Sequence, residues 1–65
     1  MSETALHRLR VERNLSQSQL AARARIHPQA LAKLERGERP IENIRFETAL
    51  NLAKALEVSP EQLLG

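Results

Sequence analysis

One helix-start signal occurs three times in these 65 residues, and it constrains the fold more than any other feature. Ser16 is a preferred capping residue, and Gln19 three positions later can return the capping hydrogen bond. Ser59 and Gln62 repeat this pairing. In the third signal, His27-Pro28, the proline takes the first helical position, where its missing N–H costs nothing. Helices are therefore predicted to begin directly after residues 16, 27 and 59.

Apolar periodicity adds two further helices. Leu6 and Leu9 lie on one stripe of a helix predicted over residues 4–13, and Asn14 tolerates the left-handed conformation that ends helices. After a loop at 37–40, Asn43 is the predicted cap of the next helix. The apolar residues of that helix recur at the spacing of a buried face: Phe46, Ala49, Leu50, Ala53 and Leu56. We predict an all-α, compact five-helix bundle that forms one domain, residues 1–65.

The composition excludes several kinds of chemistry. The chain has no Cys and no Asp, which excludes thiol catalysis, Cys-based zinc sites and Asp-containing catalytic triads. A chain of this length also leaves no room for a deep substrate cavity. The sequence shows neither a signal-peptide core nor an apolar run near the ~18 residues of a membrane span, so a cytoplasmic protein is expected. We predict no enzyme activity and no cofactor, metal or small-molecule ligand.

The charge is unevenly distributed along the chain. Residues 1–40 contain eight of the ten Lys and Arg residues against four Glu, a net charge of +4. Residues 41–65 contain two cations against four Glu, a net charge of −2. A basic first part and an acidic second part indicate a polyanionic partner on one side of the molecule.

Two of the predicted helices follow each other closely. One runs from residue 17 to about 24 and the next from residue 28 to about 36, with about three residues between them. So short a connection does not allow a relaxed antiparallel hairpin in which Leu20, Ile26 and Leu31 are all buried. The two helices are therefore expected to cross at a steep angle and to form a helix-turn-helix unit at residues 16–36.

At these residues the chain resembles a known family. The string SQSQLAARARIHPQALAKLERG is similar to the helix-turn-helix of the Cro/phage-repressor (XRE-like) DNA-binding family, and the similarity continues through NLAKALEVSPEQLL. The resemblance implies a lambda-repressor-like DNA-binding domain whose third helix enters the major groove. Two residues depart from the family's pattern, because Arg25 and Glu57 stand where glycine is usual.

The third predicted helix has one polar side. At about 100° per residue, Gln29, Lys33 and Arg36 share that side, whereas Leu31 and Leu34 point toward the core. A Gln can bond adenine and a Lys can reach guanine in the major groove. The family's docking implies four base-reading residues: His27, Pro28, Gln29 and Lys33. An ordinary solvated helix surface is the alternative interpretation of this side.

Phosphate contacts are expected from other positions. The free N–H groups at the start of the second helix, together with the Gln17 side chain, suit a phosphate. The predicted phosphate-binding residues are Gln17, Ser18, Arg8, Arg23, Arg36 and Arg39, with Arg39 favoured by the resemblance. The resemblance also pairs Arg10 with Glu35, and we assign this pair to structure, joining the first helix to the third.

The expected partner is double-stranded DNA. A module this small covers too little DNA for tight, selective binding, so we expect a homodimer on a pseudo-palindromic site with half-sites about 34 Å apart. Leu63 and Leu64 either supply a dimer surface or only close the core. The expected role is repression by occupying a promoter. The alternatives are activation, as in restriction-system controllers, and a protein-interaction module such as an antitoxin-like partner.

Overall fold

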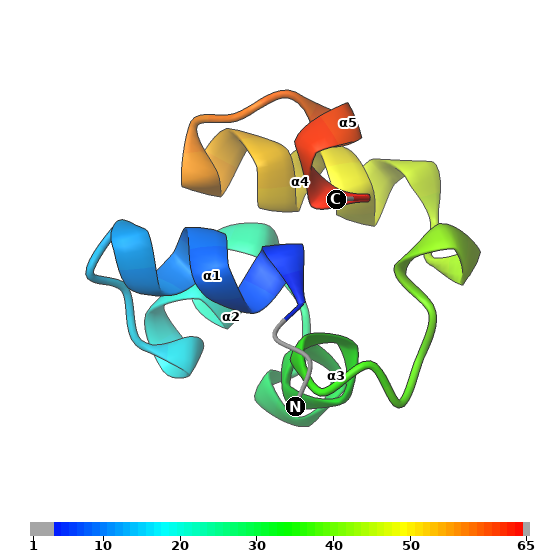
Figure 1. Cartoon of the computed structure of the whole chain (residues 1–65). Coiled ribbons are helices and arrows are strands. Elements are labelled where there is room, and N and C mark those ends of the chain that lie inside the picture. The colour runs from blue at the N-terminus through cyan, green and yellow to red at the C-terminus, as the bar shows by residue number, and fades with distance from the viewer. Residues whose placement is uncertain (1–3, 65) are drawn as a thin grey trace.

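The computed structural model describes residues 4–64. Over this range the chain forms five α-helices and one short 3-10 helix, in the arrangement shown in Figure 1. The elements are α1 (Ala5–Glu12), α2 (Gln17–Ala24), α3 (Pro28–Glu35), η1 (Ile41–Asn43), α4 (Phe46–Leu56) and α5 (Pro60–Leu63). The predicted all-α, five-helix fold is confirmed. Within residues 4–64, no helix has the length and apolar character needed to cross a bilayer.

The three helix starts predicted from capping signals, those of α2, α3 and α5, are all present. Ser16 and Gln19 form a reciprocal capping box: the Gln19 N–H donates to Ser16 Oγ over 3.0 Å, and the Ser16 N–H donates to Gln19 Oε1 over 2.9 Å. At α5, the Ser59 N–H donates to Gln62 Oε1 over 3.0 Å. At α3, His27 caps the helix through its ring, since Nδ1 accepts the Gln29 N–H over 3.0 Å. The sequence signals therefore located the starts of α2 and α3 to the residue.

Within residues 4–64, three residues other than glycine have left-handed backbones. Asn14, Arg25 and Glu57 have φ values of 57°, 61° and 59°, and each follows the end of a helix. Asn14 is where the sequence predicted such a residue. Arg25 and Glu57 adopt the conformation that glycine accommodates best, at a cost of about 1 kcal/mol each.

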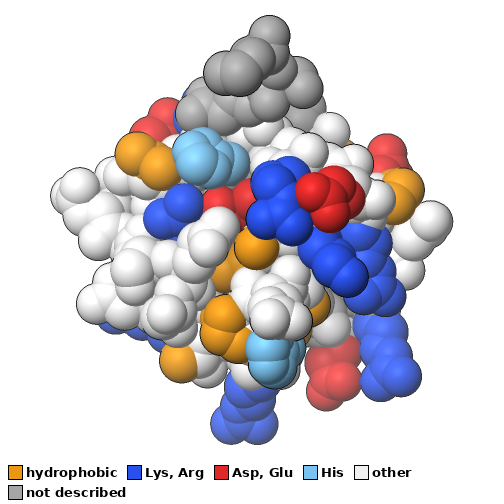
Figure 2. All heavy atoms as spheres, turned by 90° about the horizontal axis from the view of Figure 1, so that it is seen from below, with side chains coloured by type: hydrophobic (Ala, Val, Ile, Leu, Met, Phe, Trp, Pro, Cys, Tyr) orange, Lys and Arg blue, Asp and Glu red, His pale blue; other side chains and the backbone are white. Residues whose placement is uncertain are grey.

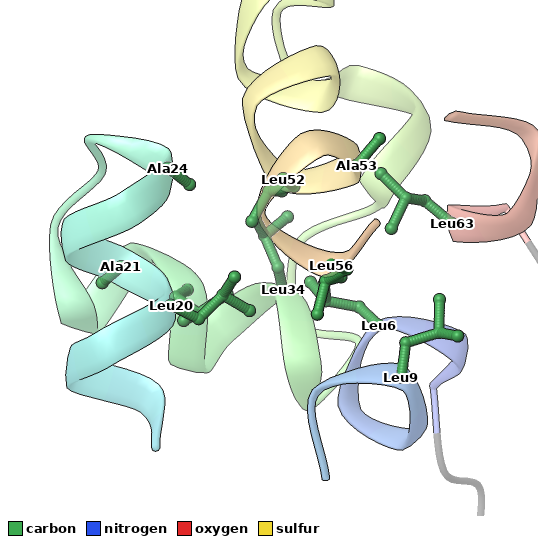
Figure 3. Packing of buried hydrophobic residues seen from close by; sticks show 11 residues of the cluster. Leu6, Leu9, Leu20, Ala21, Ala24, Leu34, Leu52, Ala53, Leu56 and Leu63 are labelled. Atoms are coloured by element: carbon green, nitrogen blue, oxygen red, sulfur yellow. The ribbon is translucent and has the colours of Figure 1, made fainter. Parts of the chain in front are cut away.

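The core lies where α2, α3 and α4 meet and is closed by α1 and α5. Leu20, Leu31, Leu52 and Leu56 are completely buried. Figure 3 shows leucines from different helices converging there, with Leu6 and Leu9 of α1 on one side and Leu63 of α5 on another. Leu63 thus closes the core, whereas Leu64 is exposed.

The start of α4 differs from its prediction. Asn43 does not cap this helix; it lies in η1, and Arg45 precedes α4 without a capping side chain. The buried stripe comprises Leu52, Ala53 and Leu56, while Phe46 is 73% exposed. Phe46 fits the helical spacing, but it is the first residue of α4 and lies beyond the end of the core. The predicted buried face of this helix does not include Leu52. The reason is that α4 is apolar on more than one side, so periodicity alone does not select the buried stripe.

Candidate nucleic-acid interface

The outer side of α3 is open to solvent. Leu31 and Leu34 are buried beneath the helix, as predicted, while Gln29, Lys33 and the following Arg36 are exposed. Figure 2 shows the face of the molecule on the side of α3, where Lys and Arg side chains gather along one edge with acidic side chains among them. The predicted base-reading residues are therefore accessible, and no described part of the chain covers them.

The start of α3 is held by its own cap. Because His27 Nδ1 accepts a backbone N–H, a neutral His27 ring carries its proton on Nε2. His27 and Pro28 are both exposed at this end of the helix. The cap therefore leaves an outward N–H donor and an apolar ring next to Gln29, which is a surface able to face base edges.

Glu35 is the one buried charged residue within the described chain. Arg10 binds it in bidentate fashion, with Nε 2.7 Å from Oε2 and Nη2 3.0 Å from Oε1. Arg10 Nη1 also donates to the Leu15 carbonyl oxygen over 2.8 Å. The expected Arg10–Glu35 ion pair is thus present, and it joins α1, the entry to α2 and the end of α3.

The Gln17 side chain, which was predicted to bind a phosphate, lies beside the carboxylate of Glu35. Its Nε2 is 3.2 Å from Glu35 Oε1, and the residue is half-buried. His7 Nδ1 also lies 3.2 Å from the same oxygen. The buried carboxylate therefore turns the Gln17 amide inward. The backbone N–H groups of Gln17 and Ser18 have no acceptor within the helix and remain at its open N-terminus.

The predicted phosphate-binding arginines differ in whether they have an acidic partner. Arg23 and Arg39 are exposed and form no ion pair within residues 4–64. Arg8 lies 3.9 Å from Glu12, a weak contact between exposed groups. Arg36 is different, because its Nε donates to Glu38 Oε2 over 2.6 Å and its Nη2 to Oε1 over 3.3 Å.

The Arg36–Glu38 contact also affects proton binding. The hydrogen bond to Glu38 raises the pKa of Arg36, and the attraction between the opposite charges adds to this. The same hydrogen bond lowers the pKa of Glu38, with a further contribution from the Arg36 charge and a smaller one from Lys33. At neutral pH both groups are therefore charged and paired on the exposed surface.

Two features of the surface were not predicted from the sequence. One is Glu38, which lies beside Lys33 and Arg36; the glycine before it, Gly37, was the available signal for a tight turn that returns the chain. The other is an apolar groove of about 380 Å³ between η1, the start of α4 and α5. We call this the apolar groove, and its apolar lining residues are Ile41, Ile44, Phe46, Ala49, Pro60, Leu63 and Leu64. No spacing rule links these positions, because they come from three elements.

The described residues contain no group of three or more His, Cys, Asp or Glu side chains placed to hold a metal ion. The two histidines have different neighbours: His7 lies beside Glu35, and His27 caps α3. What the outer side of α3 offers a ligand is hydrogen-bonding and cationic side chains, those of Gln29, Lys33 and Arg36.

Comparisons with known proteins agree with this geometry. The family model for the helix-turn-helix matches residues 6–63. The crystal structure of the restriction-modification controller protein C.AhdI from Aeromonas hydrophila is similar, with a TM-score of 0.80 and 34% sequence identity over 91% of this chain and 85% of that one. A comparison with curated protein sequences gives no match. The chain belongs to the XRE-type helix-turn-helix family of DNA-binding transcription regulators.

Proposed function

We propose that this protein is a sequence-specific regulator that binds double-stranded DNA as a homodimer, inserting residues 28–36 into the major groove of each half of a pseudo-palindromic site. The observation that carries the proposal is the outer side of α3, where Gln29 and Lys33 are exposed while Leu31 and Leu34 anchor the helix in the core. The proposed role is binding without catalysis, in the cytoplasm, where the DNA is.

The base-reading residues have distinct chemistry. Gln29 suits a bidentate contact with adenine, and Lys33 suits the O6 and N7 acceptors of guanine. His27 offers its Nε2 proton, and Pro28 offers only apolar contact, for example with a thymine methyl group. Together they favour recognition of a short mixed sequence in each half-site.

The proposed phosphate contacts come from the edges of this face. Arg23 and Arg39 are exposed and have no acidic partner within the described residues, so they are the strongest candidates. The open N-terminus of α2 adds the N–H groups of Gln17 and Ser18. Arg8 and Arg36 contribute once they leave their carboxylate partners.

The apolar groove supports the homodimer. Phe46 is 73% exposed and Leu64 is 61% exposed, and both lie at the groove. No residue of α3 lines the groove, so a partner bound there leaves the proposed DNA face free. Because the same patch offers both a hollow and a projecting aromatic ring, two copies can pair across a two-fold axis. We propose a second copy of this chain as the occupant.

Repression is the proposed outcome of promoter occupancy. A regulator acting as an activator in a restriction system is a second candidate, favoured by the similarity to a restriction-modification controller protein. The two are separated by measuring transcription from a promoter that carries the selected site: repression lowers the transcript level, and activation raises it.

The test of DNA reading is selection of bound sequences from a random duplex pool. We expect the wild-type protein to select a two-fold symmetric sequence. Gln29→Ala is expected to lose preference at one base pair per half-site and about 1–3 kcal/mol of affinity for the selected site. Arg39→Ala is expected to weaken all duplexes equally, because phosphates carry no sequence information.

The control is Lys54→Ala, which removes an exposed cation of α4 from outside the proposed face. Selection unchanged by Gln29→Ala would show that this side chain does not read bases. The salt dependence of binding tests the protein-interaction alternative, since about four phosphates per subunit predict a log–log slope near −3.6, whereas a partner held by apolar contacts responds far less.

A further inference from the structure

The end of α3 fixes Glu38 beside two cations of the proposed DNA face. The Gly37 N–H donates to the Leu34 carbonyl over 3.2 Å, and the Glu38 N–H donates to the Lys33 carbonyl over 3.0 Å. With Gly37 at a φ of +77°, these two bonds form a Schellman motif, a rigid helix ending. The chain therefore turns back, and the Glu38 carboxylate is directed to the side of α3 that carries Arg36.

The contact between Arg36 and Glu38 has the geometry of an arginine–phosphate contact. Two guanidinium nitrogens, Nε and Nη2, donate to the two carboxylate oxygens over 2.6 and 3.3 Å. An arginine binds phosphate oxygens through the same two-pronged arrangement. While this contact persists, Glu38 occupies Nε and Nη2, the two donors on that edge of the guanidinium group.

The exposed position of the Arg36–Glu38 pair suits exchange of the carboxylate for a phosphate better than it suits stabilisation of the fold. The side chains of Arg36 and Glu38 are 57% and 54% exposed, and exposed ion pairs contribute little to folding. By contrast, the side chains of Arg10 and Glu35 are 13% and 1% exposed, and they form the structural pair that joins α1 to the end of α3. Solvent and a phosphate can therefore both reach Arg36.

We propose that Glu38 is an internal substitute for a DNA phosphate, which holds Arg36 in the free protein and is displaced when α3 docks on a duplex. The proposal rests on the proposed function. Glu38 then sets affinity in two ways: it competes for Arg36, and its negative charge remains next to the incoming phosphates. The competition applies to every duplex, so Glu38 lowers affinity without changing which sequence is read.

The experiment measures binding of wild-type protein, Glu38→Gln, Arg36→Gln and the double variant to a mixed-sequence duplex, by fluorescence anisotropy over a range of salt concentrations. Glu38→Gln is expected to bind up to about fivefold more tightly at low salt, the range expected for releasing an exposed ion pair. Because salt weakens the exposed Arg36–Glu38 pair, its competition with phosphate fades as the salt concentration rises. The gain in affinity is therefore expected to shrink with salt, which makes the log–log salt slope of Glu38→Gln steeper than that of the wild-type protein. In the Arg36→Gln background, the same change at residue 38 is expected to leave the slope unaltered.

The double variant separates competition from simple repulsion. An equal gain in affinity from Glu38→Gln in both backgrounds, with no change of slope, would overturn the proposal, because charge removal alone would then account for it. Glu47→Gln is the matched control, since Glu47 is exposed on α4, does not line the apolar groove and pairs with no cation among the described residues. It is expected to keep the wild-type slope.

The outcome also distinguishes this proposal from the proposed function. If neither the wild-type protein nor Glu38→Gln binds any duplex, DNA binding itself is wrong, and the role of Glu38 falls with it. If the wild-type protein binds and only the difference between the two backgrounds is missing, the regulator remains and the exchange at Arg36 is refuted.

Discussion

At the scale of single residues, the turn between α2 and α3 is built on Arg25, which has a φ of 61°. Its N–H donates to the Ala22 carbonyl over 3.3 Å, and the next N–H, of Ile26, donates to the Ala21 carbonyl over 3.0 Å. These bonds end α2 and lead the chain directly into α3. The unfavourable left-handed conformation thus occurs at Arg25, the residue that sets the angle between the two helices of the proposed DNA-binding unit.

Replacing Arg25 tests this cost. Arg25→Gly is expected to raise the free energy of unfolding by about 1 kcal/mol, because glycine adopts positive φ without the clash of a Cβ atom. For a domain of this size, about 1 kcal/mol corresponds to a rise in Tm of roughly 4–8 °C. Thermal unfolding followed by circular dichroism measures the change. Arg25→Ala is the control, since it removes the charge but keeps Cβ, and an equal gain in both variants would show that charge and not backbone strain is responsible.

Residue-level chemistry also limited what could be predicted of the site. The exposure of Gln29 and Lys33 followed from helical spacing, which depends only on local geometry. The inward turn of Gln17 did not, because it depends on a carboxylate 18 positions away in the chain, at Glu35. The Arg10–Glu35 pair was expected from the family resemblance, since nothing in the spacing of residues 10 and 35 brings them together.

At the scale of elements, the boundaries of α2, α3 and α5 were predictable because capping is a local interaction over three or four residues. The start of α4 was not. The 3-10 helix η1 takes up Asn43, and Arg45 precedes α4 without a side-chain cap, so no local signal marks this boundary. Packing against the rest of the molecule decides where α4 begins and which of its apolar sides is buried.

The cap of α2 gives a prediction at this scale. Ser16→Ala is expected to lower the free energy of unfolding by about 1 kcal/mol, because it removes the acceptor of the Gln19 N–H. Urea unfolding measures the loss. Ser18→Ala is a matched control two residues further on, where the serine is exposed and caps nothing. Equal stability of the two variants would contradict a stabilising role for the capping box.

At the scale of the whole molecule, size and surface argue for assembly. The Cα trace measures 26 × 24 × 21 Å, which is less than the roughly 34 Å between half-sites one helical turn apart. One copy therefore reaches one half-site, and a second copy is needed to reach the other. A stable interface buries about 800 Å² per partner, a modest share of the 4499 Å² of accessible surface that one copy presents. The apolar groove combines a hollow with two exposed large apolar side chains, Phe46 and Leu64.

The assembly prediction is that Phe46→Lys dissociates the homodimer without unfolding the monomer. Phe46 is 73% exposed in one copy, so a lysine there costs the monomer little, whereas in the proposed dimer it would bring two positive charges into an apolar contact. Analytical ultracentrifugation is expected to show a dimer for the wild-type protein and a monomer for the variant, with the same helical circular dichroism. Val11→Lys is the control, because Val11 is an exposed apolar residue of α1 that does not line the groove.

The same variant also tests what the homodimer does for DNA binding. The affinity of Phe46→Lys for a duplex with two half-sites is expected to fall to the value measured for a single half-site, while the base preferences stay unchanged. A Phe46→Lys protein that remains dimeric would place the interface elsewhere on the surface, and a wild-type protein that is monomeric at every concentration, with and without DNA, would rule out the homodimer.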